Sequence, residues 1–317
     1  MLLEVINTSE TCSIVGKKTR EYLKKIDLPE GDLWELPESK LRFPDGAHFR
    51  IEVPTVNTVE CMRALLETAK DLGVTINRID ETFGIMRHTD KELIEMIELA
   101  KEYKVELNLS HGPRAKYDTS ATARTPMGAY IAYRLRGMEQ IVRAIEDIKR
   151  AIELGARGFL VYDEGLLWIL GKMRKDGELP PDVKFKASAH MGHGNPAAAK
   201  LLESLGADSF NPTRDLSPPM IAALRAALKI PIDVHVDNPP ASGGFIRTYE
   251  APIFVRIGAP IHLKCGNSVV PAHGTLPGSN EGKRMAWQAW MVVNTVKRYL
   301  PGAKQTLSPS KDMAIPK

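Results

Sequence analysis

The feature that most constrains this sequence is a strand-like segment followed by a helix-like segment, repeated about eight times between residues 49 and 302. Strands joined by helices form a parallel sheet, and eight such units over about 250 residues are typical of a (β/α)₈ barrel. We therefore predict a TIM-type barrel over residues 49–302. Its strands are predicted at residues 49–54, 74–80, 105–110, 158–163, 183–190, 208–212, 231–237 and 260–265.

A doubly wound open sheet is the alternative architecture. It would be expected to carry a glycine-rich phosphate-binding turn after its first strand. The segment Pro54-Thr-Val-Asn57 is not such a turn, so we favour the barrel and expect no nucleotide cofactor. The predicted helices span residues 58–72, 90–103 with Asp90 as N-cap, 137–154, 164–175, 197–206, a segment that starts at Ser217, and 281–300.

Two segments flank the predicted barrel. Residues 1–48 lack a clear period apart from a short helix near residues 17–26, and they are punctuated by proline and glycine. We interpret them as an N-terminal arm packed on the barrel or on a neighbouring subunit. Residues 303–317 form a C-terminal tail. Either segment could hold a second subunit, which leaves a homo-oligomer open.

Composition excludes several classes of partner. The formal net charge is only +4, and no dense run of Lys and Arg is present, so we expect no nucleic acid. No apolar run is long enough to span a bilayer, so we expect no membrane. The three cysteines are far apart and odd in number, which indicates neither disulfides nor a CxxC metal site. A reducing cytoplasm is therefore the predicted location.

The predicted strands place unusual residues in the barrel lumen. One face of each strand is apolar and suited to the surrounding helices, as in Phe49, Ile51 and Val53. A barrel interior is usually filled by Val, Ile and Leu. Here the opposite faces carry Arg50, Glu52, Glu106, Asn108, Ser110, Lys184, Lys186, Ser188, His190, Asp233, His235, Asp237, His262 and Lys264.

Buried charges must pair with one another, because an unpaired buried charge is costly. One interpretation is therefore an ion-paired plug without chemistry, which suits Arg50, Glu106, Lys184 and Asp233 at the starts of strands. Strand ends favour function, because the active sites of such barrels lie at the carboxyl ends. The candidates there are Glu52, Asp80, Ser110, His111, Asp163, His190, Asn211, Asp237 and Lys264.

Three chemistries compete for these strand ends. In the first, His190, His235 and Asp237 bind a divalent metal, Zn²⁺ or Mn²⁺, with an open position for water or a substrate oxygen. In the second, the two imidazoles act as acid and base without metal: the carboxylates raise the pKa of His235, and Lys186 lowers that of His190. In the third, Lys186 or Lys264 forms an imine with a carbonyl substrate.

The loops favour a small anionic substrate. The connection after the third strand carries Arg114, and the loop after the seventh strand offers glycine amides and Arg247. Arginine and backbone amides both suit carboxylate or phosphate groups. Loops of this length usually serve as binding loops.

Residues 195–238 resemble the U32 peptidase family. The helix at 197–207, the element Arg214-Asp215-Leu216-Ser217 and the strand that ends at His235 look like that family's helix, Arg-Glu-Leu-Ser element and histidine strand. Asp215 replaces the family's Glu, and Val236 follows the histidine in place of glycine. The four-cysteine set of the iron–sulfur members is missing, so no iron–sulfur cluster is expected.

We therefore predict a U32-like hydrolase that acts on a small anionic metabolite or a short peptide-like amide. The clustering of inward polar residues at strand ends places His190, His235 and Asp237 at its centre. His235-Val-Asp237-Asn238 also looks like the His-x-His-Asn element of metal-dependent aldol-type lyases. One alternative, based on the acid–base and imine chemistries above, is a lyase or isomerase that uses proton abstraction or a lysine imine. The other is a binding barrel without catalysis.

Overall fold

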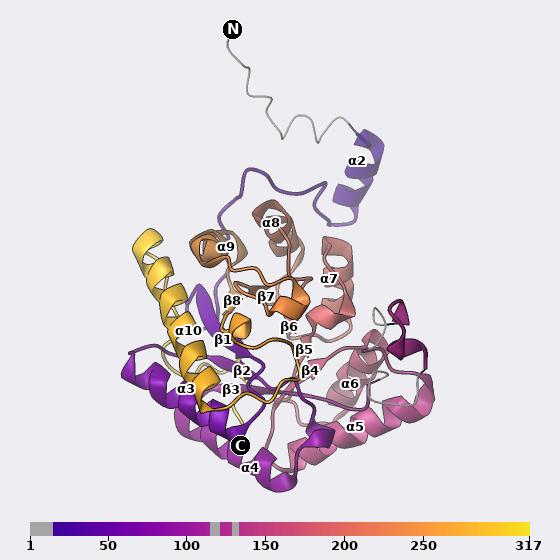
Figure 1. The fold of residues 1–317 in the computed structure, drawn as a ribbon. Helices are drawn as coiled ribbons and strands as arrows, with labels where there is room; N and C mark the ends of the chain where they lie inside the picture. Colours follow the sequence, from indigo (N-terminus) through magenta and orange to yellow (C-terminus); the bar gives the residue numbers. More distant parts are fainter. Residues whose placement is uncertain (1–14, 115–120, 129–132) are drawn as a thin grey trace.

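The computed structural model describes residues 15–114, 121–128 and 133–317, which leaves Cys12 and the start of the predicted arm outside the described residues. Eight parallel strands close into a barrel in the order β1 to β8, and helices surround it (Figure 1). The structure thus confirms the (β/α)₈ barrel. The strands are β1 (Phe49–Pro54), β2 (Arg78–Asp80), β3 (Glu106–Ser110), β4 (Gly158–Val161), β5 (Lys184–Ala187), β6 (Ser209–Phe210), β7 (Ile232–His235) and β8 (Ile261–Lys264).

The helices begin at the capping residues that the sequence supplies. Thr58 accepts a hydrogen bond from the backbone of Cys61, and Thr89 forms a capping box with Glu92. Thr89, and not the predicted Asp90, is therefore the N-cap of its helix. The helices are α2 (Lys17–Lys25), α3 (Val59–Asp71), α4 (Asp90–Tyr103), α5 (Gly137–Glu153), α6 (Glu164–Asp176), α7 (Pro196–Ser204), α8 (Pro218–Ala227), α9 (Ala251–Gly258) and α10 (Ser279–Tyr299).

Strand faces divide as the alternation predicts. Phe49, Ile51 and Val53 are at most 1% exposed and belong to the apolar core between strands and helices. The intervening Arg50 and Glu52 are equally buried on the other side, inside the lumen. Apart from the half-buried Lys184 at the start of β5, the strands are buried on both faces, as expected for a parallel barrel inside a ring of helices.

One helix was not predicted, and several strands, β2, β5 and β7 among them, are shorter than predicted. Helix α9 was not predicted, because it is only eight residues long and follows a loop rich in proline and glycine. Strand β5 ends at Ala187, three residues early, since Ala189–Met191 turn into a 3₁₀ helix capped by the Ser188 hydroxyl. His190 therefore lies on this turn above the strand.

Both flanking segments reach the barrel. In the arm, the backbone N–H of Leu33 donates to Pro219 in α8, whereas α2 lies outside the ring of helices (Figure 1). The tail covers the end where the strands begin: Asp312 binds the guanidinium of Arg50 through two bonds of 2.9 and 3.0 Å. Ala314 donates its N–H to Glu106 at 2.9 Å.

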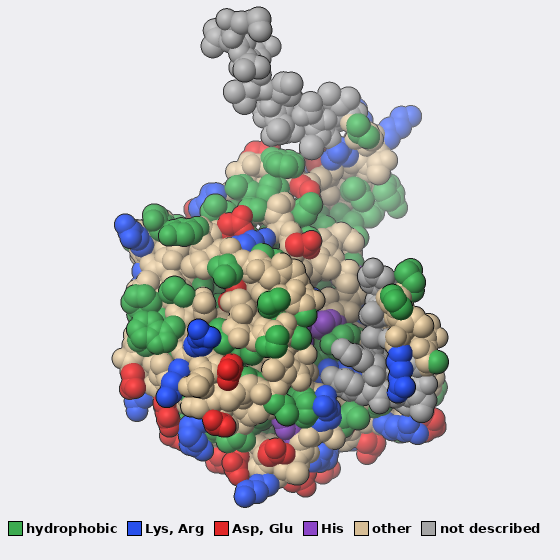
Figure 2. Space-filling view, in the orientation of Figure 1, with side chains coloured by type: hydrophobic (Ala, Val, Ile, Leu, Met, Phe, Trp, Pro, Cys, Tyr) green, Lys and Arg blue, Asp and Glu red, His purple; other side chains and the backbone are tan. Residues whose placement is uncertain are grey.

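The surface carries no large area of one charge on the face drawn in Figure 2, where acidic and basic side chains are interspersed. In the described part of the chain, no helix combines the length and apolar character needed to cross a membrane.

Candidate active site

The lower lumen, nearer the starts of the strands, is filled by an ion-pair network centred on Arg78. This guanidinium contacts Glu106 at 3.1 Å and both Glu52 and Asp233 at 3.3 Å. Burial alone would lower the pKa of Arg78, but the surrounding carboxylates raise it above its ordinary value. The predicted ion-paired interpretation therefore fits Glu106 and Asp233.

Lys186 and Lys264 lie above Arg78 and share the carboxylates of Glu52 and Asp80. Both ammonium groups contact Glu52, and they reach the same oxygen of Asp80 at 2.9 and 2.7 Å. Lys186 also has Asp233 at 3.3 Å. Burial would raise the pKa of Asp80, but the two ammonium groups hold it well below its ordinary value.

The two lysines differ in their charge surroundings. Burial lowers the pKa of Lys186, but Asp233, Asp80 and Glu52 together raise it above the ordinary value. Lys264 has only Asp80 and Glu52 as close partners, so burial prevails and its pKa lies below the ordinary value. Lys186 is therefore a fixed cation, whereas Lys264 is the easier of the two to deprotonate.

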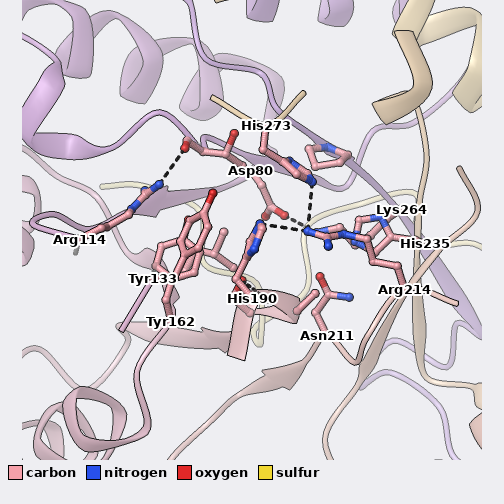
Figure 3. A pocket seen from close by; sticks show the side chains of 15 residues that line it. Asp80, Arg114, Tyr133, Tyr162, His190, Asn211, Arg214, His235, Lys264 and His273 are labelled. Atoms are coloured by element: carbon pink, nitrogen blue, oxygen red, sulfur yellow. Dashed lines mark hydrogen bonds and ion pairs between the residues drawn. The ribbon is translucent and has the colours of Figure 1, made fainter. Parts of the chain in front are cut away.

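A narrow pocket opens above Lys264 at the carboxyl ends of the strands (Figure 3). Its free volume is only about 20 Å³, enough for about one water molecule. Six predicted site residues line it: Asp80, Arg114, His190, Asn211, His235 and Lys264. The other lining residues are Pro54, Thr82, Tyr133, Leu160, Tyr162, Ser188, Ala189, Arg214 and His273.

His190 is fixed between two loops at the top of the pocket. Tyr133 stacks on its ring, with centroids 3.9 Å apart and planes at 17°. Nη2 of Arg214 lies 3.0 Å from Nε2 of His190 and 3.2 Å from Nε2 of His273 (Figure 3). His273 is held in turn by the hydroxyl of Thr55, whose backbone has a positive φ of 64°.

Arg214 is a cation that forms no ion pair with a carboxylate in the described part of the chain. Among the described residues its buried Nε also has no hydrogen-bond partner. Burial lowers its pKa from the ordinary value, because Tyr133 and Asp215 only partly offset the lost hydration. A positive group in such surroundings favours the binding of an anion.

Three imidazoles in the pocket are neutral. Burial lowers the pKa of His190 and of His235 well below the ordinary value, with Arg214 and Lys264 adding to the effect, and it lowers that of His273 to about 3. The predicted rise for His235 is therefore wrong. The neighbouring cations lower the pKa of His235, and the carboxylates that were expected to raise it are bound to other groups.

Asp237 does not join the two histidines. Its carboxylate accepts N–H bonds from Gly266 and Asn267 at 3.0 and 2.9 Å and a hydroxyl bond from Ser268 at 2.7 Å. It therefore fixes the loop after β8. The structure does not assemble His190, His235 and Asp237 into the predicted metal set, because β7 ends at His235 and the next carboxylate turns towards these amides.

One group of potential metal ligands does gather in the described residues, and it consists of Glu52, Asp233 and His262. Nη1 of Arg78 lies 3.3 to 3.4 Å from each of the three side chains. The guanidinium supplies the positive charge there, so this group does not fit a metal ion. Binding of Zn²⁺ or Mn²⁺ by other residues stays a prediction.

The remaining predicted residues do not line the pocket, and each contacts a neighbouring side chain, helix or loop. The Ser110 hydroxyl lies 2.6 Å from that of Tyr162, and His111 packs on the same tyrosine. Asp163 caps α6. The guanidinium of Arg247 donates to the backbone carbonyls of Leu216, Arg214 and His235, so it fixes loops and does not face the pocket.

Sequence reasoning missed Arg214 and His273 as site residues. Arg214 appears in the sequence only through the element 214–217, and His273 lies in a loop without periodicity. Arg78 was also missed, because β2 has only three residues and shows no clear alternation. The sequence signal that could have indicated Arg214 and His273 is the presence of arginine or histidine in loops that follow strands.

A scan against models of protein families finds no match, and a search of curated proteins finds no relative. Among solved structures, the YdjI aldolase from Escherichia coli K12 is 16% identical, with a TM-score of 0.46 over 79% of this chain and 90% of the aldolase. A U32 peptidase is 14% identical, with a TM-score of 0.42 over 73% and 96%. A thiamine phosphate pyrophosphorylase from Pyrococcus furiosus is 15% identical, with a TM-score of 0.44 over 80% and 98%. These similarities do not single out the U32 family, and at such values they carry no information about the reaction.

Proposed function

We propose that this protein is a lyase or isomerase that acts on a small anionic carbonyl compound through an imine on Lys264. The observation that carries the proposal is the position of this lysine in the floor of the mouth pocket, where burial keeps its pKa below the ordinary value. Lys186 is the weaker candidate, because three carboxylates keep it protonated.

The residues around Lys264 suit each proton transfer that an imine requires. The neutral amine attacks the carbonyl carbon, the carbinolamine loses water, and the protonated imine then accepts the electron pair of a broken C–H or C–C bond. His235 is the register partner of Lys264 on the adjacent strand, and its buried Nδ1 has no hydrogen-bond partner among the described residues. As a neutral imidazole it can accept the proton that the substrate loses when the C–H bond, or the hydroxyl O–H beside the breaking C–C bond, gives up its proton.

Arg214 supports an anionic substrate. A carboxylate or phosphate beside its guanidinium would supply the negative charge that the described residues do not. The small free volume means that lining side chains must shift before a substrate can bind, and we infer that the ring of Tyr133, stacked on His190, is one of them. The substrate is therefore expected to replace contacts made by these two rings.

Reduction with borohydride tests the proposal. Pyruvate and other small oxo acids are incubated with the protein, the imine is reduced to a stable amine, and the modified peptide is found by mass spectrometry. We expect an adduct on Lys264, its loss in Lys264→Met and its retention in the surface variant Lys229→Met. Absence of any adduct with the substrate that is turned over, or an adduct only on Lys186, would overturn the imine.

Hydrolysis of a small anionic metabolite or a peptide-like amide is the second candidate. It is favoured by the unpartnered, neutral His235, which could activate a water molecule. Turnover of such an amide that survives Lys264→Met and is lost in His235→Ala would support it. Affinity without turnover for every compound would support a binding barrel.

A further inference from the structure

A second cavity lies at the opposite end of the barrel, where the strands begin. Its volume is about 350 Å³, against about 20 Å³ in the mouth, and the two share no lining residue. Segments 42–44 of the arm and 229–231 before β7 contribute to its wall. Its size falls in the range of small-molecule sites.

Basic side chains dominate the rim of this cavity. Lys229 is exposed, and it forms no ion pair with any residue in the described ranges. Lys184 is half-buried and lies 3.3 Å from Asp208. That carboxylate is already bound by Arg174 at 2.5 Å and by the N–H of Phe185 at 2.8 Å. The charge of Lys184 is therefore only partly compensated.

The inner part of the cavity combines apolar surface with buried polar groups, among them the ion-paired Arg78 and Glu106. Phe43, Ile230 and Pro231 contribute apolar surface. His262 is fully buried, and its Nδ1 lies 2.7 Å from Asp233. Within residues 15–114, 121–128 and 133–317 its Nε2 has no hydrogen-bond partner, and the oxygen of Glu106 is 3.8 Å away. A buried nitrogen without a partner beside a cavity of this size is suited to a ligand.

We propose that this cavity binds a small organic carboxylate with an apolar body. The carboxylate lies between Lys184 and Lys229, and the body packs on Phe43 and Pro231. A hydroxyl on the far side of the body bonds to Nε2 of His262. The site is separate from the proposed active site, since the ion pairs of Lys186 and Arg78 lie between them.

Calorimetric titration of the full chain with 4-hydroxybenzoate tests this site. Benzoate lacks the hydroxyl, and 4-hydroxybenzamide lacks the charge. We expect 4-hydroxybenzoate to bind best, and we expect the double variant Lys184→Gln/Lys229→Gln to weaken it about tenfold, which corresponds to 1.4 kcal/mol. Lys229→Glu alone should weaken it at least as much as Lys229→Gln, because it reverses the charge at the rim.

A variant of the mouth provides the matched control. Arg214→Gln should leave binding of 4-hydroxybenzoate unchanged, whereas an anion bound only in the mouth would be lost. Lys229 is exposed, so its replacement leaves the fold intact, which circular dichroism checks. Absence of binding, binding unaffected by the lysine variants, or equal binding of the amide would show that the cavity holds only water and overturn the proposal.

Discussion

Replacement of Arg214 by methionine separates the cost of an unpaired charge from its use in binding. Nη2 of Arg214 bonds to His190 and His273 at 3.0 and 3.2 Å, and its Nε has no partner. None of the described carboxylates forms an ion pair with it. Methionine retains an unbranched, flexible side chain and removes the charge, so the variant tests whether the folded protein gains or loses stability from the guanidinium.

Two opposing terms set the expected change in the free energy of unfolding. Loss of two hydrogen bonds costs about 1 kcal/mol each. Removal of an ion that folding took out of water recovers several kcal/mol, which we reduce to about 3 kcal/mol because Arg214 is only partly buried. The variant is therefore expected to be more stable by about 1 kcal/mol, equivalent to about 2 °C in Tm for a large domain.

Denaturant unfolding followed by circular dichroism measures this change, with Arg247→Met as the matched control. Arg247 donates to three backbone carbonyls, so its loss should destabilise the fold by about 2–3 kcal/mol. Arg214→Met should at the same time lower kcat/KM at least about a hundredfold, the effect of about 2.7 kcal/mol. If Arg214→Met destabilises the protein as much as the control does, Arg214 is a structural clamp and the reasoning fails.

Three further outcomes follow from the buried groups. Arg78→Met should lower the free energy of unfolding by about 3–5 kcal/mol, because it leaves carboxylates in the lumen without their ion-pair partner. A loss below about 1 kcal/mol would contradict a stabilising role for this ion-pair network. Burial raises the pKa of Asp147 from 3.8 to about 6, so the folded state binds this proton more tightly. Stability should fall by about 2–3 kcal/mol as pH rises through that window, and Asp147→Asn should abolish this slope in pH-dependent unfolding. Burial raises the pKa of Cys61 to about 12 and that of Cys265 well above its usual range, so peptide mapping should find both alkylated by iodoacetamide only after unfolding.

The barrel could be predicted because most of its strands and most of its helices carry a local pattern. Alternation in residues 49–54 places Phe49 outside and Glu52 inside, and the structure has both. Prediction failed where the chain stops being periodic. Asp237 continues the alternation of β7 in the sequence, but the strand has ended, and the amides of Gly266 and Asn267 bind its carboxylate.

Part of the site could be predicted because some of its residues belong to the strand pattern. His190, His235 and Lys264 follow or end strands, so their place at the mouth follows from topology. Arg214 and His273 come from loops whose shape depends on tertiary contacts, such as the bond between Thr55 and His273. The difference in pKa between the two lumen lysines depends on how many carboxylates reach each, which no spacing in the sequence encodes.

The distribution of charge along the barrel axis separates structure from chemistry. Arg78 and Lys186, in the lower lumen, each contact three carboxylates. Lys264 contacts two, and Arg214 at the mouth contacts none of the described ones. If the lumen side chains only fixed the strand register, the protein would be most stable with each cation paired to carboxylates along the whole barrel axis, because an unpaired cation costs free energy. The deficit of negative charge increases towards the mouth, where a ligand can enter, and an anionic substrate would remove it.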